Sequence, residues 1–231
     1  MKKTPTGIYA ALVMLLIYNY ADAQKLISVK GQYGLYYKSI TGIEKQQKNE
    51  LAFFGFIKGD TIGSIGAQAC NREATYAALS DSLFFYLEDI DTTYCNTKQA
   101  RAAWQYYSLL KGTPLNSGYA IITGDEKTTH LPTASCNKIL IINSFHEFTY
   151  PAEMLHDIST KLKPGGILFI DEAMARYSGE LHPACKKRMY LQQQLISLLA
   201  ANGFAYKNSL VLAYHKNKPA RQVFAFTAVN K

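Results

Sequence analysis

The chain has 231 residues, 48% of them hydrophobic, and a formal net charge of +8. This length and composition supply one good hydrophobic core rather than two, so we expect a single folded domain. Lysines and arginines are scattered, without a stripe of basic and aromatic residues, which argues against a nucleic-acid-binding surface.

The N-terminal segment has the features of a secretory signal peptide. Lys2 and Lys3 form a basic start, residues 8–18 are apolar, and Ala21-Asp22-Ala23 is a small-x-small cleavage site. The apolar run is too short for a transmembrane helix, and an uncleaved membrane anchor is the alternative. We therefore expect residues 1–23 to be removed and the protein to be exported, periplasmic or secreted, with no membrane span after cleavage.

Residues 24–48 are interpreted as an N-terminal extension and residues 49–231 as one α/β domain. Short apolar segments predict strands, and amphipathic segments between them predict helices. The expected strands are 61–65, 83–87, 119–122, 138–143, 167–170, 210–214 and 223–228. The expected helices are 50–57, 71–79, 97–110, 151–163 and 185–202. This alternation predicts a doubly wound, Rossmann-like domain with a mostly parallel seven-stranded sheet and one antiparallel edge strand.

The segment 138–173 contains a clear strand–helix–strand unit. A continuous apolar run at 139–142 is followed by the polar loop Asn143-Ser144-Phe145-His146-Glu147, and a helix begins at Pro151. Pro164-Gly165-Gly166 separates that helix from a second apolar run, which leads into Asp171-Glu172. Ligands of such sheets bind beyond the carboxyl ends of the strands, so the polar loops there are the candidate site.

The same segment resembles a known family. A strand followed by N-S-F-H-E-F, a helix ending in L-K-P-G-G and a strand ending in D-E resembles the second half of class I S-adenosylmethionine-dependent methyltransferases. The N-S-F-H-E-F form resembles a branch of small bacterial predicted methyltransferases, and the resemblance extends from Asn49 to Lys231. It implies a methyltransferase fold, S-adenosylmethionine as cofactor, and methyl transfer to a small-molecule or peptidyl acceptor that the sequence does not identify.

The loop after the first strand departs from that family, in which it reads roughly D-x-G-x-G-x-G. Here Ser64 takes the acidic position, Gly66 is the one matching glycine, and Gln68 and Cys70 take the other two glycine positions. The resemblance implies that Gly66, Ala67 and Gln68 contact the amino-acid end of the cofactor. A side chain at 68 costs about 1 kcal/mol if the backbone there needs a positive φ. Restoring Asp at 64 and Gly at 68 is expected to raise cofactor affinity.

The resemblance also implies roles for polar residues after the next strands. Asp89 would accept the ribose hydroxyls, with the neighbouring Glu88 and Asp91 as alternatives. Asp125 and Glu126 would meet the adenine, although Gly124-Asp125 is equally consistent with a plain β-turn. Asn143 is a further cofactor-binding candidate.

His146 and Glu147 are the candidate catalytic residues. His146 would act as general base, because its pKa suits proton transfer near neutral pH, and Glu147 would orient it or bind substrate. Adjacent residues in a loop tend to point apart, however, and a packing or helix-capping role for His146 is the alternative.

The four cysteines show no C-x-x-C spacing, so no zinc site is expected from them. Cys70 and Cys95 follow two strands that are neighbours in this topology. In an oxidising compartment they could form a disulfide, with two buried free thiols as the alternative.

Two functions stay open at this point. The first is an exported methyltransferase with an unknown acceptor. The second is a non-catalytic exported protein that kept the fold and binds another ligand or a protein partner; the altered glycine loop favours it, as does export away from the cytoplasm where the cofactor is made. A dinucleotide-binding oxidoreductase fits less well, because the loop is even further from G-x-G-x-x-G.

Overall fold

The computed structural model describes residues 37–216 and 218–229. The predicted signal peptide, residues 1–23, therefore lies outside the described residues. Within the described part of the chain, every helix is too short or too polar to span a bilayer.

The described elements alternate along the chain as expected for an α/β domain. The strands are β1 (Thr61–Ile65), β2 (Phe84–Asp89), β3 (Gly118–Thr123), β4 (Cys136–Ile142), β5 (Leu162–Ala173), β6 (Phe204–His215) and β7 (Lys218–Ala228). The helices are α2 (Ile40–Phe54), α3 (Asn71–Leu79), α4 (Thr97–Lys111), the 3₁₀ turn η1 (Phe145–Glu147), α5 (Pro151–Lys161) and α6 (Gln192–Ala201).

All seven described strands form one sheet in the order β3-β2-β1-β4-β5-β7-β6. The pairs from β3 across to β5 are parallel, and β7 is antiparallel to both β5 and β6. The predicted doubly wound, mostly parallel seven-stranded sheet is thus confirmed, and its antiparallel edge is a β6–β7 hairpin in which β7 lies inside. Strand order reverses between β1 and β4, which is where open α/β sheets bind ligands.

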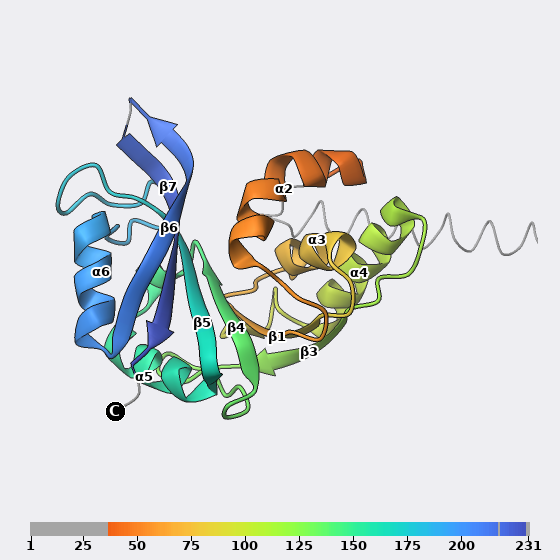
Figure 1. Cartoon of the computed structure of the whole chain (residues 1–231), viewed down its shortest axis with the longest axis horizontal. Coiled ribbons are helices and arrows are strands. Elements are labelled where there is room, and N and C mark those ends of the chain that lie inside the picture. Colours follow the sequence, from red (N-terminus) through yellow and green to blue (C-terminus); the bar gives the residue numbers. More distant parts are fainter. Residues whose placement is uncertain (1–36, 217, 230–231) are drawn as a thin grey trace, which may run out of the picture.

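Helices cover both faces of the sheet (Figure 1). The helices α2, α3 and α4 pack on one face, and α5 and α6 pack on the other. The apolar run of β4 packs on both faces of the sheet: Leu140 joins the first core, whereas Ile139 and Ile141 join the second.

The two longest of the described helices carry strong end signals. At α2 the Ser39 side chain accepts a hydrogen bond from the Gly42 N–H, and the helix ends at Gly55 in the left-handed conformation. At α4 the Asn96 side chain accepts from the Gln99 N–H, and Gly112 ends the helix in the same way. These caps explain why α2 begins at Ile40, ten residues before the helix expected at 50–57.

The helix predicted at 185–202 is wrong in its first part, because α6 begins only at Gln192. The chain before it makes local β-type contacts: Leu181 pairs with Arg188, and the Met189 N–H donates to the Glu180 carbonyl. These bonds use backbone groups that a helix would need.

The last two strands are longer than the apolar runs at 210–214 and 223–228 indicate. The first residues of β6 after Phe204 are exposed, because β6 is the edge strand, and their polar side chains hide the strand pattern. Likewise Leu162, expected in the helix before it, follows the last residue of α5 and is buried at the start of β5.

Candidate functional site

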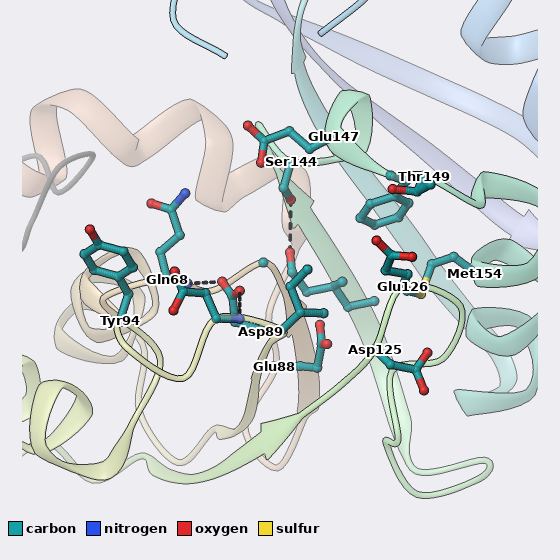
Figure 2. A pocket seen from close by; sticks show the side chains of 15 residues that line it. Gln68, Glu88, Asp89, Tyr94, Asp125, Glu126, Ser144, Glu147, Thr149 and Met154 are labelled. Carbon is teal, nitrogen blue, oxygen red and sulfur yellow. Dashed lines mark hydrogen bonds between the residues drawn. The ribbon is translucent and has the colours of Figure 1, made fainter. Parts of the chain in front are cut away.

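A cavity of about 300 Å³ lies at the carboxyl ends of β1 to β4, where the strand order reverses (Figure 2). Its size is at the lower end of the range for small-molecule sites. The walls come from the loops after these four strands and from the start of α5. The lining residues are Ile65, Gly66, Gln68, Glu88, Asp89, Ile90, Asp91, Tyr94, Asp125, Glu126, Ser144, Glu147, Phe148, Thr149 and Met154.

The loop after β1 keeps a glycine-type backbone without the glycines. φ is 74° at Gly66, 45° at Gln68 and 59° at Cys70, so all three positions lie in the left-handed region. A Cβ at Gly66 would come within 2.6 Å of the Ser144 Oγ, which explains the glycine that remains. The side chain of Gln68 reaches into the cavity, and that of Ala67 does not line it.

Ser64, at the position of the missing acid, contacts an acid from another element. Its hydroxyl donates to the Glu73 Oε1 on α3 at 2.5 Å, and both residues are buried. Burial raises the pKa of Glu73. The carboxyl that the sequence lacks at 64 is thus present beside it, and an aspartate at 64 would meet a second buried carboxyl.

Two adjacent acids end β2 and line the cavity. The Asp89 Oδ2 accepts the Gln68 N–H and the Asp89 Oδ1 accepts the Asp91 N–H, each at 2.9 Å, so this carboxylate has a fixed orientation at the cavity wall. Glu88 is 1% exposed, and burial, together with the charge of Asp89, raises its pKa to about 8. A Cβ at Gly124 would overlap the Glu88 carboxyl at 1.9 Å, so glycine is required there.

The turn after β3 uses the Asp125 carboxylate for its own structure. Asp125 accepts the N–H groups of Lys127 and Thr128 and the Thr128 hydroxyl, and these bonds lower its pKa to about 2. The β-turn interpretation therefore describes this residue, although Asp125 and Glu126 both line the cavity as a cofactor contact requires.

The loop after β4 separates the two candidate catalytic residues. Glu147 lines the cavity and is about half exposed, whereas the His146 side chain is 0% exposed and contributes nothing to the lining. The His146 Nδ1 lies 2.8 Å from the Glu172 Oε2. Burial lowers the pKa of His146, the bond to Glu172 raises it, and the net direction is upward. The geometry does not support His146 as a general base acting on a ligand in this cavity.

Asn143 is also outside the lining, and Ser144 takes its place. Asn143 adopts a φ of 52° and donates its N–H to the Asp171 carbonyl. The Ser144 Oγ donates to the Ile65 carbonyl and lies against Gly66. The sequence did not indicate that Tyr94 and Met154 line the cavity, because an apolar or aromatic residue in a helix or loop carries no sign of facing a cavity.

The cavity is strongly acidic. Among the described residues that line it there is no lysine or arginine. The acidic lining residues are Glu88, Asp89, Asp91, Asp125, Glu126 and Glu147. A cavity with this charge favours a cationic ligand and disfavours the pyrophosphate of a dinucleotide.

The sheet order, the reversal between β1 and β4 and the cavity at that edge define a class: the chain has the Rossmann-like fold of S-adenosylmethionine-dependent methyltransferases. A SAM-dependent methyltransferase from Aquifex aeolicus is similar with a TM-score of 0.59 and 16% identity, over 83% of this chain and 99% of that chain. The 1,6-didemethyltoxoflavin-N1-methyltransferase of Burkholderia thailandensis, solved with S-adenosylhomocysteine, is similar with a TM-score of 0.58 and 14% identity, over 100% of this chain and 92% of that chain.

The fold is shared with a protein of another activity. The [4+2]-cyclase SpnF is similar with a TM-score of 0.57 and 15% identity, over 93% of this chain and 95% of that chain. No protein-family model matches this chain, and no curated protein matches it. The structural likeness therefore establishes the fold, and the activity has to be argued from the site.

Proposed function

We propose that the protein binds S-adenosylmethionine in the acidic cavity and transfers its methyl group to a small-molecule or peptidyl acceptor. The observation that carries this proposal is Asp89. It ends β2 beside the strand reversal, lines the cavity, and has its carboxylate oriented by the Gln68 and Asp91 N–H groups. A carboxylate with lone pairs left on both oxygens is the group that accepts two ribose hydroxyls.

The charge of the cavity supports the same ligand. S-adenosylmethionine carries a sulfonium and an ammonium group, and carboxylates surround the space from the loops after β2, β3 and β4. The bound cofactor supplies the electrophilic methyl group. The chain supplies orientation, and Glu147, half exposed at the cavity wall, is the carboxylate placed to receive a proton from the acceptor.

The experiment is a calorimetric titration of the purified protein with S-adenosylmethionine and with S-adenosylhomocysteine, with and without reductant. We expect micromolar binding that Asp89→Ala abolishes. Asp81→Ala is the matched control, because Asp81 is exposed and lies just before β2, at the opposite end from Asp89. Its affinity should equal that of the unchanged protein.

A second function is favoured by one observation, the Gln68 side chain in a loop that normally keeps glycine. In this case the fold is retained without methyl transfer, and the cavity binds another cationic ligand or the surface binds a protein partner. Failure to bind at millimolar S-adenosylmethionine in either redox state would select this function over the first.

Export is part of the proposal. It is supported by the basic start, the apolar run at 8–18 and the small-x-small site ending at Ala23. The test is intact-mass analysis of protein recovered from outside the cytoplasm, for which we expect a chain that begins at Gln24. A full-length mass in the cytoplasmic fraction would contradict export.

A further inference from the structure

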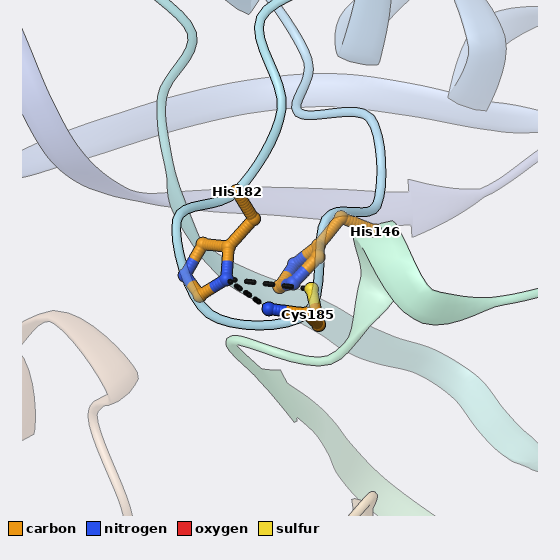
Figure 3. A group of neighbouring side chains, drawn as sticks. All are labelled: His146, His182 and Cys185. Carbon is orange, nitrogen blue, oxygen red and sulfur yellow. Dashed lines mark hydrogen bonds between the residues drawn. The ribbon is translucent and has the colours of Figure 1, made fainter.

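Three potential metal ligands converge outside the cavity. His146 comes from η1, at the carboxyl end of β4, and His182 and Cys185 come from the loop that joins β5 to α6 (Figure 3). One ligand atom from each of the three side chains lies within 4.8 Å of the other two. None of the three lines the cavity described above.

His146 is held as a metal-binding histidine requires. Glu172, at the end of β5, accepts the His146 backbone N–H on one carboxyl oxygen at 3.2 Å and lies 2.8 Å from the imidazole Nδ1 with the other. This carboxylate fixes the ring and keeps the proton on Nδ1. Nε2 is therefore the ring nitrogen that would bind a metal, which displaces any proton there; this atom is buried and has no hydrogen-bond partner among the described residues. A carboxylate behind a histidine whose other nitrogen is free is the usual support of a metal ligand.

His182 and Cys185 are brought together by a tight turn. The Lys186 N–H donates to the His182 carbonyl at 3.0 Å, which closes the turn, and the Cys185 Sγ lies 3.3 Å from the His182 Nδ1. The ring centroids of His182 and His146 lie 4.8 Å apart. Two donors spaced as H-x-x-C on one turn thus face a third donor that is already fixed.

We propose that His146, His182 and Cys185 bind a zinc ion. Two imidazole nitrogens and a thiolate form the donor set that zinc prefers, whereas calcium and magnesium prefer oxygen donors. Ligand atoms around tetrahedral zinc lie about 3.3–3.6 Å apart, so a pair separated by 4.8 Å has to contract by about 1.2–1.5 Å. The turn that carries His182 and Cys185 is largely exposed and can make that adjustment.

The position of the ion gives it a structural role next to the cavity. It would tie the loop between β5 and α6 to the end of β4. The Glu147 Oε1 lies 3.8 Å from the His146 Nε2, so a carboxylate close to this proposed ligand atom also lines the cavity. Zinc would therefore order the cavity wall formed by the loop after β4. The cysteine spacing alone does not show this site, because two of its three ligands are histidines.

The test uses the metal-free, fully reduced protein titrated with Co²⁺, a spectroscopic substitute for Zn²⁺. We expect one equivalent to bind with a thiolate-to-cobalt charge-transfer band and tetrahedral d–d bands, and Zn²⁺ to displace it. Cys185→Ser should remove the charge-transfer band, and His182→Ala should weaken binding at least tenfold. His156→Ala is the control, because His156 is exposed on α5 and should change nothing.

Cys185→Ser and His182→Ala are at partly exposed positions of a loop, so both variants should fold. Circular dichroism checks that they do. The proposal is overturned if reduced protein shows no cobalt bands at tens of micromolar Co²⁺. It is equally overturned if both variants bind like the unchanged protein. The readout needs no S-adenosylmethionine, so this result does not depend on the proposed function.

Discussion

Gln68 has two features that a glycine at this position would not have. Its φ of 45° is costly for a residue with a Cβ, and its side chain reaches into the cavity. We predict that Gln68→Gly raises the affinity for S-adenosylmethionine about tenfold, or ~1.4 kcal/mol, by clearing that space. The stability should change little, because relief of about 1 kcal/mol of backbone strain is offset by the flexibility of glycine in the unfolded chain.

Calorimetry on Gln68→Gly and Gln68→Ala separates the two contributions. Alanine clears the side chain but keeps the backbone strain that Gln68 already has, so it should raise affinity to a similar extent and leave stability close to that of the unchanged protein. Unchanged affinity in both variants would show that Gln68 does not obstruct the cofactor.

Glu88 predicts a pH dependence of stability. Its pKa in the folded protein is about 8, raised by burial and by Asp89, whereas in the unfolded chain it is near the ordinary value for glutamate. Between these values the folded protein holds a proton that the unfolded chain has lost, so the free energy of unfolding falls as pH rises and the loss is complete above about pH 8. Glu88→Gln removes this penalty without removing the acceptor for the Gly66 N–H.

We therefore expect Glu88→Gln to be more stable than the unchanged protein by about 2–4 kcal/mol at pH 8 and nearly equal to it at pH 4. Denaturant titrations at the two pH values measure the difference. Glu153→Gln, at an exposed position on α5, is the control and should show none. A difference that is the same at both pH values would assign the effect to packing instead.

At the scale of elements, two cysteines lie close together where α3 and α4 begin. The Sγ atoms of Cys70 and Cys95 lie 3.8 Å apart, both are buried, and both are free thiols in this structure. We predict that they form a disulfide under oxidising conditions, because rotation of the two side chains closes most of the remaining distance to a bond of about 2.05 Å. This disulfide would close the loop that runs from Cys70 to Cys95, and a disulfide across a loop of that length stabilises the fold by about 3 kcal/mol.

Mass spectrometry of non-reduced peptides is the measurement, with Cys70→Ser as the variant that cannot form the bond. Because Cys70 lies two residues from Gln68, the oxidised protein should also bind S-adenosylmethionine with a different affinity. Alkylation of both thiols in the non-reduced, air-exposed protein would rule the disulfide out.

The elements also show what a sequence can and cannot predict. The predicted bounds of β1 and α3 agree with the structure, because β1 lies between Asp60 and Gly66 and α3 is a short alanine-rich segment that ends before Ser80. The helix predicted from Cys185 is wrong over its first seven residues, because backbone bonds to distant partners such as Glu180 replace helical ones there. Spacing along the chain carries no information about those partners.

The candidate site was also predictable only in part. The loops after β1 to β4 line the cavity, because strand ends are visible in sequence, whereas Asp171 and Glu172 at the end of β5 do not line it. The directions of His146 and Glu147 were not, since two adjacent residues of one turn face different surroundings. The hydrogen bond from Ser64 to Glu73 was also hidden, because it joins a strand to the next helix. For that reason Ser64→Asp, which restores the family pattern, is expected to weaken the fold.

At the scale of the whole molecule, the charge of the cavity is opposite to that of the chain. The formal net charge is +8, yet the described lining of the cavity is acidic and without lysine or arginine. Sequence composition sums all charges and cannot show such a separation, which arises because the acidic loops after β2, β3 and β4 meet at one edge of the sheet. A charged ligand should therefore respond to the local charge of the cavity rather than to the net charge of the chain.

This separation predicts a difference between two ligands that differ by one charge. S-adenosylmethionine carries a sulfonium, and S-adenosylhomocysteine carries a neutral sulfur. We expect the affinity for S-adenosylmethionine to fall more steeply with added salt, by about threefold more between 20 and 500 mM KCl, because salt screens the attraction of the carboxylates. Calorimetric titrations of both ligands across this range measure the two slopes. Glu126→Gln, at an exposed position of the cavity wall, should reduce the difference, whereas Glu153→Gln outside the cavity should leave it intact. Parallel slopes for the two ligands would show that the sulfur atom does not face the acidic wall, and would place the cofactor elsewhere or in another orientation.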